Sequence, residues 1–474
     1  MQVIVQSECK GGIGLGKSTI GNSDFNREMK GLVIPSVLQM LVANSFSLVN
    51  MLMVTNLGDG AVAVTAAAGR ISFILSMILT AVYGMTSYIT QYHGKHQLTL
   101  VRATFGFMLL TGIGISLLSF VVVSIWKEPI LSLFIKDVEL LPLGIQYVSI
   151  MVFVFLISAV RDAYAQALGS LGKVKITLYV GLCAMMINII LDYGLIYGRL
   201  GLPNLGVVGA AWGTLIATGT SLLFLIVFIY IKSYYLNIRI QELFSLPMIL
   251  RKQVVKTITP LVFHEGMWSI GNMLYAVAFG SLSIAALTTF QLANTLQGYF
   301  MMGIHGFAYA AKVMIGQKLG QDNQEQAMDY ARRYTRISVI AGIIVSVVMM
   351  MGSPFVAFIF PNLSTEVHAS LGNILLLQGM VMTALFLNNV WIVGMFRAGG
   401  DNLFTMIMIL MTTWGIALPA VFVGTYVFRL PMEWVYALFL CEEMSKAFIG
   451  YRRYRSQKWM RNLVGNHSET PTSA

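Results

Sequence analysis

Apolar stretches long enough to cross a lipid bilayer recur along the chain from Gly31 to Gly450, with only short polar gaps between them. A helix needs about 20 residues to cross the hydrocarbon, and within lipid a helix satisfies its backbone hydrogen bonds inside one segment. Charged residues make up 11% of the chain, whereas a soluble domain carries about 25%. We therefore expect an all-α integral membrane protein, with no soluble domain between its spans.

The positive charges indicate how the chain is oriented in the membrane. Lys and Arg gather in alternate gaps, whereas the intervening gaps are poor in them. The clustered residues are Lys95, Arg102, Lys173, Lys175, Lys232, Arg239, Arg251, Lys252, Lys256, Lys318, Arg332, Arg333, Arg336, Arg452, Arg453, Arg455, Lys458 and Arg461. This positive-inside pattern predicts that both termini are cytoplasmic and that the number of spans is even. The net charge of +11 is then explained by the membrane rather than by nucleic acid.

Twelve transmembrane helices are predicted, in two pseudo-symmetric bundles of six around a central cavity. They are expected to begin near Leu32, Val62, Ala103, Leu143, Val174, Val207, Thr257, Ile284, Tyr330, Leu371, Leu403 and Met432. The expected regions are a cytoplasmic tail (1–30), an N-lobe (31–231), a basic cytoplasmic loop (232–256), a C-lobe (257–452) and a basic cytoplasmic tail (453–474).

Short motifs repeat between the two halves. QYHG at Gln91–Gly94 matches QKLG at Gln317–Gly320, and each half has an Arg before a glycine turn, Arg161 in one and Arg397 in the other. A duplicated six-plus-six bundle is typical of secondary transporters, whose substrate site lies near the midplane between the halves.

A nucleotide or a resident cofactor is not expected. GGIGLGKS at 11–18 fits the letters of a phosphate-binding loop, but that loop needs a strand before it, a helix after it and a second strand carrying a metal-binding Asp. About thirty residues before the first span are too few for such a domain. Three scattered cysteines, Cys9, Cys183 and Cys441, do not form a zinc or disulfide framework.

The fifth and sixth predicted helices carry the clearest candidate ion site. Asn188 and Asp192 are four residues apart and share one helical face, and Thr214 is expected at similar depth on the next helix. A carboxylate, an amide oxygen and a hydroxyl together suit Na⁺, or Asp192 alone accepts a proton. The alternative is that Asp192 is a buried hydrogen-bonded group that locks the bundle.

The second half offers a second candidate site for coupling or substrate. His264 and Glu265 lie well inside the seventh predicted helix, where Glu265 either exchanges protons, pairs with a cationic substrate, or is bonded within the bundle. His264 alone is more typical of a core histidine. Further polar residues expected to line this patch are Gln291, Asn294, His305, Asn388 and Asn389.

Three other charged residues stand inside predicted spans. Arg70 in the second helix either extends to the outer face of the membrane or meets an acid or an anionic substrate in the cavity. Glu442 and Glu443 in the twelfth helix are interpreted as structurally paired residues.

From Lys30 to Trp459 the sequence resembles the multidrug and toxic compound extrusion (MATE) family, and in its first half the DinF-like branch. The motifs that carry the resemblance are NMLMVTNLGDGAVAV, TQYHGK, SLGKVKITLYVGLCAMMINIILDYGLIYG, LGVVGAAWGTLIAT, TPLVFHEGMWSIGN, GQKLGQDNQEQA and MFRAGGDN. The resemblance implies a monomeric antiporter, not an enzyme, in the bacterial inner membrane. It would export a small organic compound in exchange for H⁺ or Na⁺.

The resemblance also implies roles for residues. In DinF-like members an Asp, Asn, Asp and Thr of the N-lobe carry the coupling ion; the last three match Asn188, Asp192 and Thr214, whereas Asn50 replaces the first acid. NorM-like members use acids in the seventh and tenth helices instead. The alternative function, a flippase for a lipid-linked saccharide, belongs to related folds that usually carry extra helices and a more basic cavity.

Overall fold

The N-lobe is built from the first half of the chain. The computed structural model describes residues 22–135, 137–232, 236–355 and 363–465. The N-lobe helices are α1 (Asn22–Thr55), α2 (Asp59–Val82), η1 (Tyr83–Met85), α3 (Thr86–Gly94), α4 (Leu98–Ser132), α5 (Leu141–Ser170), α6 (Val174–Tyr197) and α7 (Val207–Ile231). The 3₁₀ turn η1 continues α2 into α3, so these three form one span.

The C-lobe follows a short 3₁₀ helix, η2 (Ile240–Phe244). Its elements are α8 (Met248–Leu282), α9 (Ile284–Gly320), α10 (Gln324–Gly352), η3 (Ser353–Phe355), α12 (Thr365–Asn389), η4 (Val390–Phe396), α13 (Asn402–Ile409), η5 (Leu410–Ala417), α14 (Leu418–Phe422), η6 (Val423–Val427) and α15 (Met432–Arg455). Three of them, η4, η5 and η6, are π-helical and continue their neighbours. Each lobe therefore has six spans, as the sequence predicted.

Among the helices that begin earlier than the hydropathy pattern suggests, α1 and α8 show the largest differences. Helix α1 starts at Asn22, ten residues before Leu32, because Phe25 is buried against the rings of Tyr330 and Tyr334. Helix α8 starts at Met248, within the stretch expected to be the loop between the lobes. Polar helical turns thus extend both spans beyond the apolar segment.

Nine helices of the described residues are long and apolar enough to cross a membrane by composition alone. The other three spans are α8, α9 and α15, which carry ionisable residues within otherwise apolar helices. Most charges of the C-lobe interior stand on these three, which marks them as the helices to examine for function.

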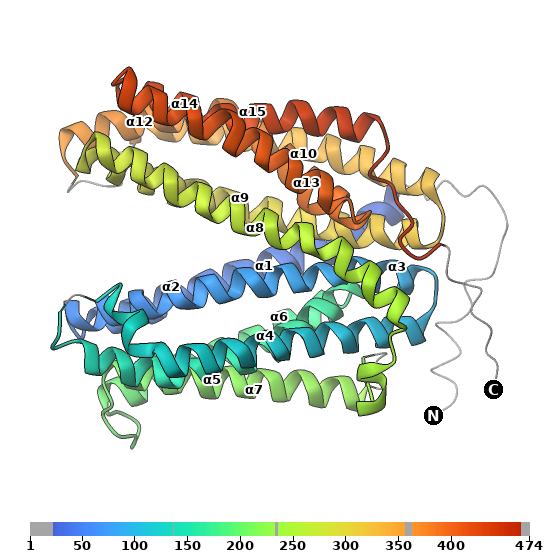
Figure 1. Ribbon diagram of the computed structural model, residues 1–474, viewed down its shortest axis with the longest axis horizontal. Coiled ribbons are helices and arrows are strands. Elements are labelled where there is room, and N and C mark those ends of the chain that lie inside the picture. Colours follow the sequence, from blue (N-terminus) through green and yellow to red (C-terminus); the bar gives the residue numbers. More distant parts are fainter. Residues whose placement is uncertain (1–21, 136, 233–235, 356–362, 466–474) are drawn as a thin grey trace.

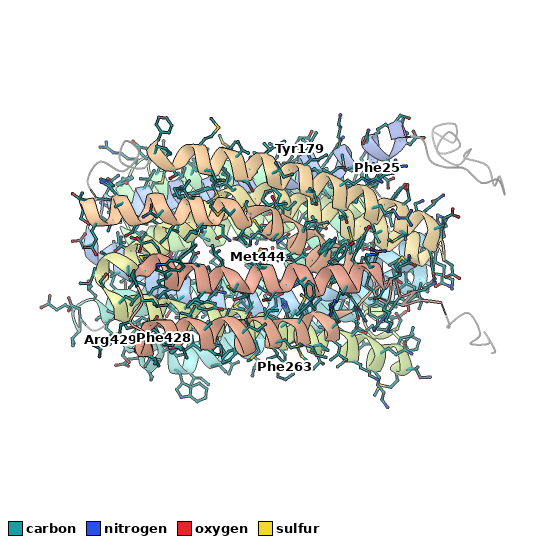
Figure 2. The ribbon with its side chains drawn as sticks, turned by 90° about the horizontal axis from the view of Figure 1, so that it is seen from above. Phe25, Tyr179, Phe263, Phe428, Arg429 and Met444 are labelled. Carbon is teal, nitrogen blue, oxygen red and sulfur yellow. The ribbon has the colours of Figure 1, made fainter. Side chains whose placement is uncertain are left out.

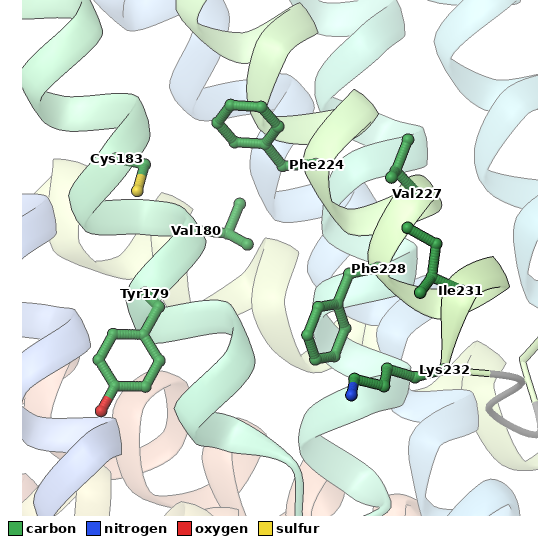
Figure 3. Close-up of a pocket in the computed structure, with 8 residues that line it drawn as sticks. All are labelled: Tyr179, Val180, Cys183, Phe224, Val227, Phe228, Ile231 and Lys232. Atoms are coloured by element: carbon green, nitrogen blue, oxygen red, sulfur yellow. The ribbon is translucent and has the colours of Figure 1, made fainter. Parts of the chain in front are cut away.

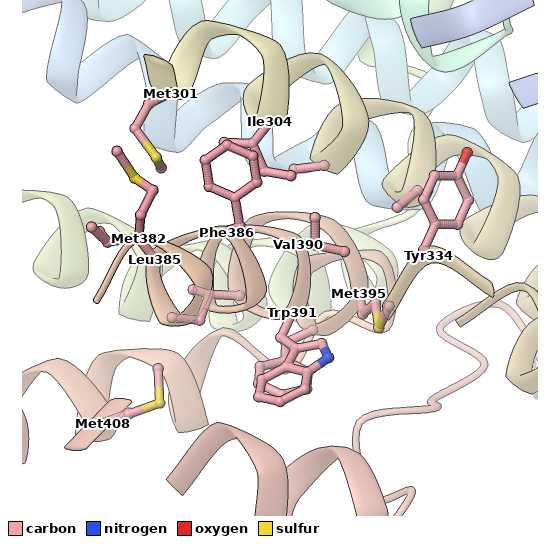
Figure 4. Packing of buried hydrophobic residues seen from close by; sticks show 14 of the residues in the cluster. Met301, Ile304, Tyr334, Met382, Leu385, Phe386, Val390, Trp391, Met395 and Met408 are labelled. Carbon is pink, nitrogen blue, oxygen red and sulfur yellow. The ribbon is translucent and has the colours of Figure 1, made fainter. Parts of the chain in front are cut away.

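Apolar side chains fill both lobes and also cover the outside. In the C-lobe, Phe386, Val390 and Trp391 pack among Met301, Ile304 and their neighbours (Figure 4). On the outside, Tyr179 and Phe263 are 64% and 58% exposed and lie at opposite edges of the molecule (Figure 2). An apolar exterior of this kind is expected of a surface that faces lipid.

The two lobes lie side by side, close together at the end that holds α3 and diverging towards the other end (Figure 1). We call the first end the closed end. There, the repeated tetrads pack against each other reciprocally: a Cβ on Gly94 would overlap the carbonyl of Gln317, and a Cβ on Gly320 would overlap the carbonyl of Gln91. The internal repeat thus places its two matching glycines at the contact between the lobes.

The segment after α15 fastens the closed end further. The side-chain amide of Gln91 donates to the carbonyls of Ala398 (2.8 Å) and Arg461 (3.1 Å) and accepts from the Leu463 backbone N–H (2.7 Å). Asp401, whose side chain is buried, pairs with Arg461 at 2.9 Å. One N-lobe glutamine therefore binds both the C-lobe and the chain that follows it.

Replacing Gly320 with Ala should loosen the closed end. The added methyl group meets backbone rather than a flexible side chain, and overpacking of this kind costs about 1–3 kcal/mol. Spin labels at His96 and Glu325, one on each lobe in a cysteine-free background, should report longer distances in the variant. Gly114→Ala is the control, because a Cβ there meets nothing within 4 Å; equal distances in both variants would contradict the role of the glycine contact.

Candidate functional site

Asp192 of α6 lies in a pocket that a glycine of α7 creates. Its side chain is completely buried, and a Cβ on Gly213 would overlap its Oδ1 atom. No residue larger than glycine fits at 213 without moving the carboxylate. Helices α6 and α7 thus approach closely at the depth of Asp192.

The hydrogen bonding of this carboxylate is incomplete. The Asn188 amide donates to Oδ1 at 3.3 Å, while Oδ2 has no hydrogen-bond partner among the described residues. The Tyr147 phenol on α5 is within electrostatic reach of the carboxylate. A buried carboxylate oxygen without a partner is costly unless the group is protonated or meets a cation.

Two other predicted members of the set make no hydrogen bond to Asp192 among the described residues. The Thr214 hydroxyl donates to the carbonyl of Ala210 at 2.9 Å, one turn back on its own helix. Asn50 on α1 is half-buried. Within the described part of the chain, no hydrogen bond joins either side chain to Asp192.

In the C-lobe, Glu265 pairs with an arginine that sequence reasoning had treated only as a marker of the repeat. The Arg397 guanidinium, at the end of η4, lies 2.7 Å from Glu265 Oε1, with the two side chains 12% and 16% exposed. His264 Nδ1 lies 3.6 Å from the same carboxylate oxygen. The pair joins α8 to the end of η4 beside the contact between the lobes.

A second buried cluster connects α15 to its neighbours. Lys446 lies 2.5 Å from Glu442 Oε1 and 2.8 Å from Glu443 Oε1. Thr413 and Tyr275 donate to Glu442. The two glutamates are thus paired, as the sequence predicted. Their partner is Lys446, one turn further along the same helix.

The other predicted C-lobe residues do not form one patch with Glu265. Asn388 donates to the carbonyl and Oε2 of Glu443, both at 2.8 Å, whereas Asn389 interacts with His305 of α9. Gln291 and Asn294 stand near the start of α9. At 1.5 Å per residue, Gln291 lies about 21 Å along the helix from His305, too far to share a small site.

Arg70 has no carboxylate partner among the described residues. It is exposed, and its guanidinium lies 5.8 Å from the centre of the Phe134 ring. A cation over an aromatic face is stabilised by about 0.5–1 kcal/mol at an exposed site.

Sequence reasoning missed Lys312 of α9. Its ammonium donates to Thr86 of α3 at 2.6 Å, across the contact between the lobes, and it is within electrostatic reach of Arg397. The available signal was a lone lysine in the apolar and small-residue run FAYAAKVMIG.

An apolar pocket on α6 and α7 contains none of these polar groups. It has a volume of about 310 Å³ and opens between α6 and α7, where Tyr179, Cys183 and Phe224 line it (Figure 3). Its lining is almost entirely apolar, which suits a lipid chain better than an ion. Nor do three or more His, Cys, Asp or Glu side chains gather into a metal site anywhere in the described ranges.

Comparison with known protein families gives one match in each lobe. The MatE family model matches residues 35–194 in the N-lobe and 260–423 in the C-lobe. The chain belongs to the MatE family. It is therefore a membrane transporter and not an enzyme, as the resemblance implied.

Individual relatives agree with this membership. The chain is 23% identical to "Uncharacterized transporter YisQ" of Bacillus subtilis, over 86% of this chain and 90% of that protein. It is 25% identical to "Multidrug resistance protein PmpM" of Pseudomonas aeruginosa, over 83% and 82%. The MATE transporter VcmN of Vibrio cholerae, solved in a mutant form, shares the fold with a TM-score of 0.83 at 17% identity, over 93% of this chain and 98% of that one.

Proposed function

We propose that this MatE transporter exports a small organic compound from the bacterial cytoplasm in exchange for H⁺ or Na⁺, and that Asp192 binds the coupling ion. The observation that carries the proposal is the completely buried Asp192 carboxylate, whose Oδ2 has no hydrogen-bond partner among the described residues. Relatives whose names include multidrug resistance support an organic substrate.

A single acid is sufficient for such coupling. The N-lobe candidates are Asn50, Asn188, Asp192 and Thr214. Asn50 cannot ionise, so Asp192 is the one acid among these four residues. Protonation removes its buried charge, and Na⁺ would neutralise it with help from the Asn188 oxygen. Either event changes which conformation is favoured, because an unpaired carboxylate is costly only while it is buried.

Alternating access would require the closed end to open. The bonds to be broken there include those of Gln91 with Ala398 and Leu463, and of Ser87 with the Arg397 carbonyl at 2.7 Å. When two polar surfaces separate, water replaces the hydrogen bonds between them, so separating them costs less than opening an apolar core. The two lobes would then move as largely rigid bodies.

The energetics limit what one ion can do. Moving one net charge through 100 mV supplies about 2.3 kcal/mol, which supports a gradient of roughly 40-fold for a substrate without net charge. A substrate gradient of this size is useful for export, and its size is limited by the membrane potential.

Counterflow in proteoliposomes tests the proposal. A proton gradient and a sodium gradient are imposed separately on the wild-type protein, with a fluorescent organic dye of no net charge as substrate. One of the two gradients should drive uptake against the substrate gradient, and this identifies the coupling ion. Equal, passive equilibration under both gradients would remove the antiport mechanism.

Deleting residues 1–20 should leave gradient-driven transport unchanged. This segment contains the phosphate-loop letters and lies outside the described residues, and no nucleotide step enters the proposal. The truncated protein is measured in the same liposomes without ATP. Loss of this ATP-independent transport in the truncated protein would contradict the expectation and would favour a role for the phosphate-loop segment.

A further inference from the structure

Two cations and one carboxylate meet beside the contact between the lobes. Lys312 of α9 and Arg397 at the end of η4 are within electrostatic reach of each other, and Glu265 pairs with Arg397 at 2.7 Å. We call Lys312 and Arg397 the basic pair. One carboxylate pairs with one of these two basic side chains, and burial of Lys312 opposes its charged form, so an anion beside it would favour that form.

The backbone places the basic pair side by side. A Cβ on Gly394 would come within 3.0 Å of the Ala308 carbonyl and within 3.2 Å of Ala311 Cβ. Helices η4 and α9 are therefore in direct contact at these residues. Arg397 and Lys312 follow about one turn later on their respective helices, which brings the two cations to the same level.

Neither cation has all the acceptors it requires. The Nε atom of Arg397 has no hydrogen-bond partner among the described residues. For Lys312, the structure gives one acceptor, the Thr86 hydroxyl, and no carboxylate within ion-pair distance in the described part of the chain. Lys446 of the same lobe, by contrast, lies between two carboxylates. The basic pair therefore has bonding capacity that the protein itself does not use.

The position of the pair suits a ligand held between the lobes. Thr86 and Ser87 of α3 approach it from the N-lobe, through the Lys312 ammonium and the Arg397 carbonyl respectively. Lys312 is half-buried and Arg397 is 12% exposed. An anion at this place would touch both lobes and would be partly removed from water, where charge-assisted hydrogen bonds are strong.

We propose that Lys312 and Arg397 bind a carboxylate of the transported compound, so that the substrate is an organic acid or a zwitterion rather than a simple cation. The proposal rests on the proposed export function and names its substrate class. Glu265 keeps the guanidinium in place and neutralises one charge, which leaves Lys312 as the basic group whose charged form a bound carboxylate would stabilise. The Thr86 contact holds the Lys312 ammonium at the boundary between the lobes.

Two dyes that differ at one group test this proposal. Tetramethylrhodamine carries a free benzoate and is a zwitterion, whereas its methyl ester is a cation of nearly the same shape. Binding to the purified full-length protein is measured by fluorescence anisotropy, with empty detergent micelles as blank. We expect the free acid to bind about tenfold more tightly than the ester, the effect of one charge-assisted hydrogen bond.

The variants separate a binding role from a structural one. Lys312→Gln keeps a donor for Thr86 but removes the charge, so it should abolish the preference for the acid, and Lys312→Arg should restore it. Lys318→Gln on the same helix is the matched control, since Lys318 bonds Gln321 near the helix end, and it should leave the preference intact. Unchanged elution and thermal unfolding of each variant show that it is folded.

The remaining outcomes decide for or against the anion site. Equal binding of the two dyes, tighter binding of the ester, binding of neither, or a preference that survives Lys312→Gln would overturn it. Competition by sodium benzoate supports a carboxylate site, whereas displacement by inorganic phosphate alone would contradict that assignment. If the acid binds through Lys312 but neither gradient moves either dye, the export function fails while the anion site stands.

Discussion

The Asp192→Asn protein is expected to fold and to lose gradient-driven transport. Asparagine has nearly the same shape, and its Oδ1 atom still accepts the hydrogen bond from Asn188. An amide neither takes up a proton near neutral pH nor supplies a negative charge to Na⁺. For a substrate without net charge, the accumulation ratio that one coupled charge supports, roughly 40-fold at 100 mV, should therefore fall to about one.

Counterflow under the gradient that drives the wild-type protein is the measurement, and passive exchange of labelled substrate is recorded beside it. The matched control is Asp59→Asn, the same substitution at an exposed position at the start of α2, which should retain full accumulation. Full accumulation by Asp192→Asn would assign this acid a structural role. Glu265 would then be the next acid to test.

The sequence predicted the span count and the burial of Asp192 for clear physical reasons. Hydropathy reports whether a segment is in the membrane, and a four-residue spacing places Asn188 and Asp192 on one face whatever else the chain does. Neither property depends on which helices become neighbours.

Partners across helices were much harder to predict. Asn388 and Asn389 are adjacent in sequence, but Asn388 bonds to α15 whereas Asn389 lies near His305 of α9. The π-helical turns of η4 follow directly, and each such turn shifts the faces of the residues beyond it relative to a regular 3.6-residue count. Pairing of Glu265 with Arg397, 132 positions later in the chain, depends on tertiary packing and is invisible to spacing.

Replacing Lys446 with Met should cause the largest loss of stability of any substitution considered. The ammonium is 8% exposed and lies within 2.8 Å of two carboxylates, on Glu442 and Glu443. Without it, two adjacent acids are left in a buried environment with no cation. Removing one partner of a buried ion pair costs about 3–5 kcal/mol, which should appear as a marked drop in the apparent Tm of the detergent-solubilised protein.

The charge balance, rather than the loss of the lysine itself, should account for this effect. Adding Glu442→Gln and Glu443→Gln to Lys446→Met removes the two uncompensated charges and should recover a large part of the lost stability. Lys252→Met, an exposed position on α8, should change the apparent Tm little. If the triple variant is no more stable than Lys446→Met alone, the cluster stabilises the C-lobe through its hydrogen bonds to Thr413, Tyr275 and Asn388. In that case the bonds between helices, and not the ion pair, hold α15 against the rest of the lobe.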